Sequence, residues 1–178
     1  PTACFLTIYQ GRVKPLLEAI ITLPLVLPPT VLGFYLLLTL SPQSYLGQIF
    51  MNLFGEPFVF TFTGLVLGSI LFSLPFMVKP IQSSLENLPS EWWVIGRSLG
   101  KTKLQLLARV FLPNCMAGIL SACVLTFAHT IGEFGVVLML GGNIPGETRV
   151  ASLAIYDLVE SLDYQGAHAY SAVLMLLS

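Results

Sequence analysis

The sequence predicts an all-α fold, a polytopic transmembrane helical bundle, and three observations support that class. Of 178 residues, 55% are hydrophobic and only 10% are charged, and the mean hydropathy is +0.83. Soluble domains carry about 25% charged residues, so this chain has too few to cover a surface that faces water. Three long segments lack Asp, Glu, Lys and Arg altogether. Each is long enough to cross a bilayer as a helix.

The three predicted spans are residues 19–40, 58–78 and 110–132. A helix rises about 1.5 Å per residue, so about 20 residues cross the hydrocarbon core. The first span contains Pro24, Pro28 and Pro29. Because each proline removes a backbone donor, we expect kinks that neighbouring helices accommodate.

Both ends of the sequence have the character of incomplete membrane helices. Residues 2–9 resemble the tail of a preceding hydrophobic helix, the last fifteen residues begin another, and the chain does not start with Met. We therefore expect residues 1–178 to form a single transmembrane domain that is truncated at both ends.

The cations predict the orientation of the spans. Five of the eight Lys and Arg residues lie between positions 79 and 109, and two more precede the first span. By the positive-inside rule, residues 10–18 and 79–109 face the cytoplasm, whereas 41–57 and 142–165 face outward. The sequence thus predicts a multi-pass protein in a lipid bilayer. Its formal net charge of −1 argues against a nucleic-acid partner, which requires a basic surface.

The stretch GRSLGKT, residues 96–102, looks like a nucleotide-binding P-loop, but its spacing differs. It has three residues between its glycines where the P-loop has four. The surrounding residues predict a short helix, 90–99, with Ser90 as its N-cap and with Trp92, Ile95 and Leu99 along one apolar stripe. We therefore expect no nucleotide at this site.

A helical elbow is the structure that these residues predict instead. Gly100 suits the left-handed position that ends a helix, and Thr102 with Gln105 forms a capping box that starts another. The second helix, 103–112, runs toward the membrane and meets it near Pro113. The elbow lies within a cytoplasmic loop, residues 79–112.

This elbow resembles the coupling loop of ABC importer permeases. The family motif is E-A-A, three residues, Gly, nine residues, Ile, any residue and Leu-Pro. Gly100 and residues 110–113 (VFLP) match the second half in register. The first half falls on residues 94–96 (VIG), so the acidic residue is absent and only the small third position remains. Glu91, one helical turn earlier, is the candidate to replace the acidic residue.

The resemblance assigns the docking of ATP-binding ABC subunits to this loop. The residues assigned to docking are Glu91, Trp92, Trp93, Val94, Ile95, Gly96, Arg97, Gly100, Val110, Leu112 and Pro113. Trp92 and Trp93 are the natural knobs for a partner's groove, because aromatic residues are frequent among interface hot spots. An aromatic belt at headgroup level is the alternative interpretation of this pair.

Longer stretches of the sequence are similar to the molybdate permeases of bacterial ABC transporters. These stretches are residues 23–34, 73–89, 131–135 and 142–160. The resemblance implies a permease subunit that moves molybdate across the bacterial cytoplasmic (inner) membrane by alternating access. It implies a homodimer with a second permease copy, ATP-binding subunits on the cytoplasmic side, and an external substrate-binding protein. Sulfate and tungstate remain open as substrates, because a permease sequence does not separate tetrahedral dianions of similar size.

Two short segments are candidates for the ion pathway or its gate. In Pro28-Pro29-Thr30, a broken helix would present backbone N–H groups to an anion. The segment Gly132-Glu133-Phe134-Gly135 holds the only acidic or basic residue between Arg109 and Glu147. A carboxylate repels an oxyanion, so we expect Glu133 to have a structural or gating role and to pair with donors inside the bundle.

The sequence predicts no catalytic residue, no cofactor and no metal site. His129 and His168 are isolated, and the three cysteines lack the spacing of metal ligands. ATP hydrolysis is expected on the partner subunit. An ion-coupled secondary transporter is a rival class, although inverted repeats are not evident. An intramembrane enzyme is another, but its candidate pair, His129 and Glu133, equally fits an i,i+4 hydrogen bond.

Overall fold

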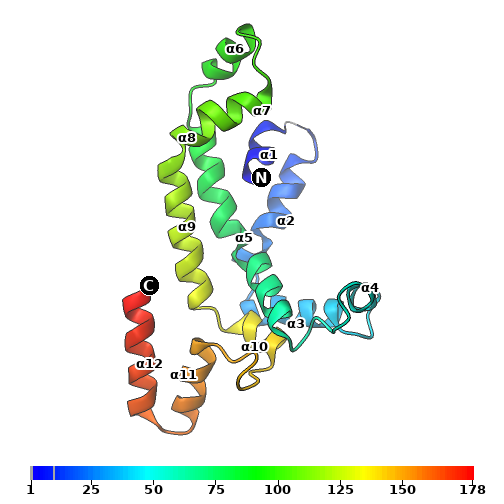
Figure 1. Ribbon diagram of the computed structural model, residues 1–178, viewed down its shortest axis with the longest axis vertical. Coiled ribbons are helices and arrows are strands. Elements are labelled where there is room, and N and C mark those ends of the chain that lie inside the picture. The colour runs from blue at the N-terminus through cyan, green and yellow to red at the C-terminus, as the bar shows by residue number, and fades with distance from the viewer. Residues whose placement is uncertain (1, 10) are drawn as a thin grey trace. The chain divides into compact units, whose positions relative to one another are not determined.

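The computed structural model describes residues 2–9 and 11–178, and every regular element among them is a helix (Figure 1). The predicted all-α class is confirmed. The described residues form two compact units, and each unit is assembled from two separate stretches of chain. The first unit contains the chain up to Thr22 and Leu74–Thr126, and the second contains Leu23–Ser73 and Phe127–Ser178.

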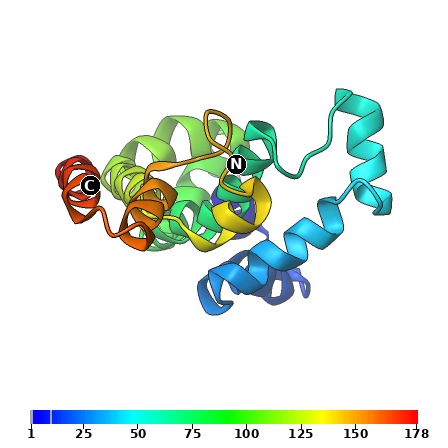
Figure 2. The ribbon, with the colours of Figure 1, turned by 90° about the horizontal axis from the view of Figure 1, so that it is seen from below.

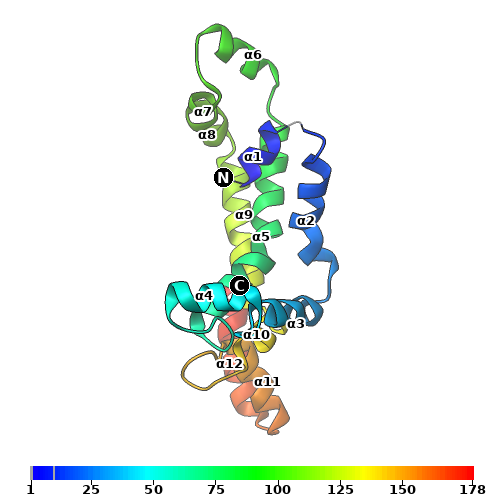
Figure 3. The ribbon, with the colours of Figure 1, turned by 90° about the vertical axis from the view of Figure 1, so that its right-hand side faces the viewer.

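The first unit combines the elbow with helices from both of its stretches of chain. Its elements are α1 (Thr2–Ile8), the first part of α2 (Lys14–Val26), the second part of α5 (Phe62–Glu86), α6 (Glu91–Ser98), α7 (Lys103–Leu106), a π-helical turn (Leu107–Phe111), α8 (Leu112–Asn114) and most of α9 (Met116–Ile131). α1 packs against α2 and α5 through buried Ala3, Leu6 and Val78 (Figure 3). α5 and α9 approach closely at Gly118, where an added Cβ would overlap the hydroxyl of Ser84.

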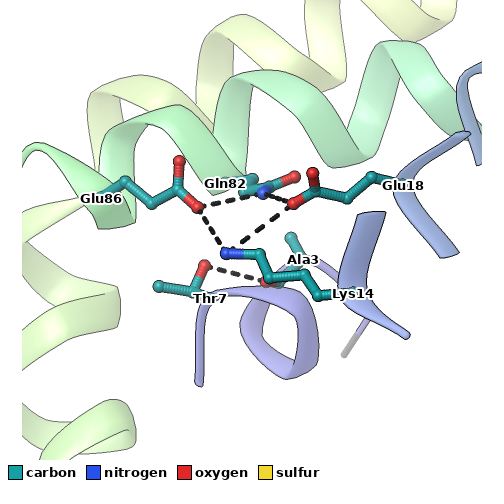
Figure 4. Close-up of polar contacts among 6 residues, drawn as sticks. All are labelled: Ala3, Thr7, Lys14, Glu18, Gln82 and Glu86. Atoms are coloured by element: carbon teal, nitrogen blue, oxygen red, sulfur yellow. Dashed lines mark hydrogen bonds and ion pairs between the residues drawn. The ribbon is translucent and has the colours of Figure 1, made fainter. Parts of the chain in front are cut away.

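A polar cluster joins α2 to α5 in this unit (Figure 4). The side chain of Gln82 is only 5% exposed, and its Nε2 donates to Glu18 Oε1 at 2.6 Å and to Glu86 Oε1 at 3.0 Å. Lys14 Nζ lies 3.8 Å from Glu18 Oε1 and 3.4 Å from Glu86 Oε1. One amide and one ammonium group therefore hold two carboxylates together.

The second unit contains two pairs of packed helices. Its elements are the remaining parts of α2, α5 and α9, together with α3 (Pro29–Leu40), α4 (Tyr45–Phe54), α10 (Gly135–Gly141), α11 (Ala151–Glu160) and α12 (Tyr164–Leu177). α3 and α10 lie side by side (Figures 2 and 3), with buried Val136 and Leu140 in the core that they share. α11 and α12 form a hairpin that turns at Leu162, whose φ is +63°, and Asp163 then caps α12 by accepting from Gly166 N at 3.0 Å.

α5 is the one helix of the described chain that is long and apolar enough by itself to cross a membrane. The count rises to three if each of two bent helix pairs forms one span. α5 begins at Phe62, later than the predicted position 58, because Phe60 turns the chain with a φ of +63°. Thr61 Oγ1 then accepts from Gly64 N at 3.2 Å and starts the helix.

The other two predicted spans are not single helices. Between α2 and α3 the chain turns by 116°, far more than a proline kink. Consecutive prolines explain the break, since Pro28 is extended (φ −55°, ψ 135°) as a residue before proline prefers. Residues 103–131 bend by 73° at Cys115, which interrupts the predicted span 110–132. α5 also continues to Glu86, so the connection to α6 starts later than residue 79.

Candidate functional site

The predicted elbow is formed by α6, the turn at Gly100 and α7 (Figure 1). Gly100 has a φ of +70°, the left-handed conformation that was expected, and nothing lies within 4 Å of an added Cβ. Gln105 N donates to Thr102 Oγ1 at 3.3 Å, and Thr102 N donates to Gln105 Oε1 at 3.1 Å. The left-handed glycine and the capping box are therefore confirmed.

The predicted N-cap at Ser90 is wrong. Ser90 has helical dihedral angles (φ −64°, ψ −23°), and its side chain makes no capping hydrogen bond. Its carbonyl accepts from Trp93 N at 3.1 Å, and the carbonyl of Pro89 accepts from Trp92 N at 3.2 Å. The first turn thus already includes Ser90, which leaves its hydroxyl outside the hydrogen bonding of the helix.

α6 lies directly on α7 at Gly96. An added Cβ on Gly96 would overlap both methyl groups of Leu106, which is buried. A side chain at position 96 would therefore require the side chain of Leu106 to shift. This position is the small third residue of the predicted motif, and helix contact is the physical reason for its size.

The two tryptophans of α6 pack inward on the buried ring of Phe111. Trp93 stacks on Phe111 with 4.0 Å between ring centroids, and Trp92 meets the same ring edge-on at 6.1 Å. Both tryptophans are half-buried, whereas Val94 and Ile95 are exposed. Trp93 is thus not presented outward as the expected knob, because the elbow's own core uses its ring.

A groove of about 420 Å³ opens between α6 and α7. The predicted stripe of Trp92, Ile95 and Leu99 lines it, with Leu99 71% exposed and Ile95 57% exposed. The other lining residues are Gly96, Lys101, Gln105, Leu106, Arg109 and Val110. Exposed apolar side chains beside two cations suit a partner segment that carries apolar and acidic residues.

The remaining docking candidates lie in three different settings. Leu112 is half-buried, Pro113 and Glu91 are exposed, and Arg97 is exposed but does not line the groove. Sequence reasoning missed Leu106 and Phe111, which hold α6 in place through tertiary contacts. No local pattern identifies such contacts, although both residues are buried in the same hydrophobic cluster.

Comparison with known proteins identifies the family. The family model described as "binding-protein-dependent transport system inner membrane component" matches residues 1–178. The chain belongs to this family. It is therefore an inner-membrane component of a transport system and not an enzyme, and the predicted resemblance is confirmed at the family level.

Individual relatives of this transport component carry two kinds of name. The "molybdenum transport system permease protein ModB" of Azotobacter vinelandii is 42% identical over 178 residues, which are 100% of this chain and 79% of the relative. The protein of the same name from Escherichia coli K12 is 35% identical over 165 residues, 93% of this chain and 71% of the relative. The "sulfate transport system permease protein CysT" of Salmonella typhimurium is 34% identical over 176 residues, which are 99% of this chain and 63% of the relative.

In the second unit of the transport component, the starts of α3 and α10 meet. An added Cβ on Gly135 would lie 2.8 Å from Pro29 Cβ and 2.9 Å from Thr30 N, so α10 begins directly against the first turn of α3. The structure thus brings together the two predicted pathway segments, 28–30 and 132–135. Residues 28–30 are exposed.

Glu133 is buried and holds the start of α10. Its Oε1 accepts from Val136 N at 2.8 Å, and its carbonyl accepts from Ser152 Oγ at 2.6 Å. Burial raises the pKa of Glu133, while hydrogen bonds from the backbone N–H groups of residues 134–136 act in the opposite direction. Phe134 packs on Tyr156 with 5.2 Å between ring centroids, and Gly132 is exposed. These contacts favour the structural role for Glu133.

Within residues 2–9 and 11–178, no group of three His, Cys, Asp or Glu residues is placed to hold a metal ion. His129 stacks on Phe72 with 4.9 Å between ring centroids. Its setting is that of an aromatic packing residue in the second unit.

Proposed function

We propose that this chain is the membrane-spanning permease subunit of an ATP-driven importer that moves molybdate across the cytoplasmic membrane. The observation that carries the proposal is the 42% identity over the whole chain to a protein named as a molybdenum transport permease. The sulfate transport permease of Salmonella typhimurium is 34% identical, so sulfate is the alternative substrate. Tungstate has the same shape and charge as molybdate, so it remains a possible substrate of the same permease.

We further propose that the groove between α6 and α7 receives the ATP-binding subunit. Leu99 and Ile95 provide exposed apolar contact area, and Lys101 and Arg109 provide charge for orientation. ATP-driven closure of the partner would then displace α6, and the Gly96–Leu106 contact would pass the displacement to α7. A permease coupled in this way needs no nucleotide site of its own.

The assembly that we propose contains two copies of this chain, two ATP-binding subunits and an external binding protein. The chain crosses the membrane several times, with α5 as one span and each bent helix pair as another. The segments 10–18 and 79–109 face the cytoplasm by the positive-inside rule. Residues 1–178 act as one transmembrane domain in this assembly.

The junction of α3 and α10 is the proposed ion pathway or gate. Thr30 and Gly135 meet there, and the neighbouring Pro28 and Pro29 interrupt the helix, as in transporters whose broken helices present backbone groups to anions. Glu133 supports this junction through the start of α10 and does not contact the ion.

The test is to purify the full-length protein from its native membrane and to measure ATPase activity with and without a molybdate-loaded binding protein. We expect a stable ATPase partner and stimulated hydrolysis. Stimulation by sulfate-loaded protein alone would replace molybdate with sulfate. A protein that purifies alone and transports under an ion gradient without ATP would contradict the proposal.

A further inference from the structure

A second cavity borders α6, on the face away from the groove. Its volume is about 320 Å³, and it is lined by Thr7, Ile8, Ser90, Trp93, Arg97 and Lys103. Along α6 its residues recur at positions 90, 93 and 97, whereas those of the groove recur at 92, 95 and 99. A shift of two residues rotates the helix by about 200°, so the two sets lie on nearly opposite faces.

The chemistry of this cavity is cationic. Among the residues that the structure describes, none that lines this cavity is acidic, and neither Arg97 nor Lys103 forms a salt bridge with an acidic side chain. The Ser90 hydroxyl is not used to cap α6, and Trp93 is fixed by its stack on Phe111. Ser90, Arg97 and Lys103 thus line one hollow, and their hydroxyl, guanidinium and ammonium groups are the kinds of donor that bind phosphate.

We propose that this cavity, the anion pocket, binds a phosphate group at the cytoplasmic face of the membrane. Its source is the headgroup of an anionic phospholipid or free inorganic phosphate. Ile8 and Trp93 add apolar wall beside the cations, which suits a lipid headgroup with its attached glycerol. The placement at the cytoplasmic leaflet rests on the proposed orientation, in which 10–18 and 79–109 face inward.

A bound phosphate would join three segments of the first unit. Thr7 and Ile8 belong to α1, Ser90, Trp93 and Arg97 to the α6 region, and Lys103 begins α7. Because the anion pocket and the groove lie on opposite faces of α6, the phosphate holds the elbow against α1 and leaves the groove open to a partner.

The experiment measures both ligands on the purified full-length permease in detergent. Equilibrium dialysis gives the affinity for radiolabelled inorganic phosphate, and native mass spectrometry gives the fraction of protein that retains phosphatidylglycerol. We expect Arg97→Gln and Lys103→Gln each to weaken binding about fivefold, the factor that corresponds to about 1 kcal/mol per cation near an anionic surface. The double variant should lose about 25-fold.

The matched control is the double variant Lys101→Gln with Arg109→Gln. It removes the same number of positive charges from exposed residues of the elbow, but on the groove side. If anions were held only by general attraction to a basic surface, the two double variants would lose the same amount of binding. Binding in the anion pocket is lost only with Arg97 and Lys103.

Retention of phosphatidylglycerol without measurable phosphate binding identifies a lipid headgroup site. Binding of labelled phosphate in its absence identifies a site for the free anion. Equal losses in the two double variants, or no binding of either ligand by the unmodified protein, would overturn the proposal. Neither assay involves an ATPase or molybdate, so the result is independent of the proposed transport function.

Discussion

Gly96 of α6 lies against Leu106 of α7 so closely that an added Cβ would overlap both leucine methyl groups. This contact sets the separation of the two helices that wall the groove. Alanine normally stabilises a helix by about 1 kcal/mol relative to glycine, but overlap in a packed contact costs about 1–3 kcal/mol. The overlapping atoms are the ends of the Leu106 side chain, which also lines the groove, so we expect that side chain to shift and to change the shape of the groove.

We therefore expect Gly96→Ala to weaken retention of the ATPase subunit during co-purification. Gly132→Ala is the control, since the nearest atoms to an added Cβ there are at 3.7 and 3.8 Å, ordinary contact distances. The double variant Gly96→Ala with Leu106→Ala should retain more ATPase than the sum of the single effects predicts. Strict additivity would mean that the two positions do not act through this contact.

Replacing Gly100 with valine should uncouple ATP hydrolysis from transport. At a φ of +70° a β-branched residue costs about 1–2 kcal/mol, which shifts the conformational equilibrium of the elbow by about tenfold. Transport per ATP in proteoliposomes is the measurement. Gly55→Val is the matched control, because Gly55 also has a left-handed φ (+78°) and no atom within 4 Å, but ends α4 far along the chain. Equal losses in both variants would point to general instability.

Two leucines of nearly equal exposure distinguish docking in the groove from docking elsewhere on the elbow surface. Leu99 is 71% exposed and lines the groove, while Leu104 is 74% exposed and does not. Leu99→Glu should reduce association with the ATPase subunit by at least tenfold, since it removes apolar contact area and places a negative charge where the groove's cations would meet an acidic partner segment. Leu104→Glu should have little effect. The reverse order would place the docking surface on the other side of α7.

Gln82→Leu should lower the thermal stability of the solubilised protein. The substitution removes both amide donors to Glu18 and Glu86 and leaves Lys14 alone between two carboxylates. Loss of hydrogen bonds from a buried group to charged partners costs about 1.5–3 kcal/mol. Gln165→Leu is the control, a change of the same kind at an exposed position of α12. A fluorescence-detected melting curve that is equal for the two variants would show that the cluster contributes nothing.

Local signals in the sequence predicted the elbow well, and tertiary contacts limited the rest. Gly100 and the Thr102–Gln105 box depend only on neighbouring residues, so they could be read directly. The position of Ser90 in the first turn depends on how the chain leaves Pro89, and the capping pattern alone does not reveal it. Trp93 looked like a surface knob because nothing in the sequence connects it to Phe111, the ring on which it stacks.

In the membrane segments, too, local sequence predicted some features and tertiary contacts determined the others. Composition identified apolar stretches, and Pro28-Pro29 marked where the first one breaks. The turn of 116° could not be predicted, because it accompanies the contact between the start of α3 and Gly135, more than a hundred residues later in the sequence. The expected kink was therefore too small, whereas the alternative of a broken helix at Pro28-Pro29-Thr30 agrees with the structure.

In the proposed coupling, the bend at Cys115 sets the direction of the motion that the elbow would pass to α9. The helical segment 103–114 meets α9 at 73°, and the cosine of that angle is about 0.3. A push along segment 103–114 would therefore have only a small component along the axis of α9, and most of the displacement would be perpendicular to that axis. α9 would therefore tilt rather than move along its own axis. A tilt of α9 would open or close a lateral gap, and it would change the depth of the α9 side chains less than a slide of the same size along the helix axis.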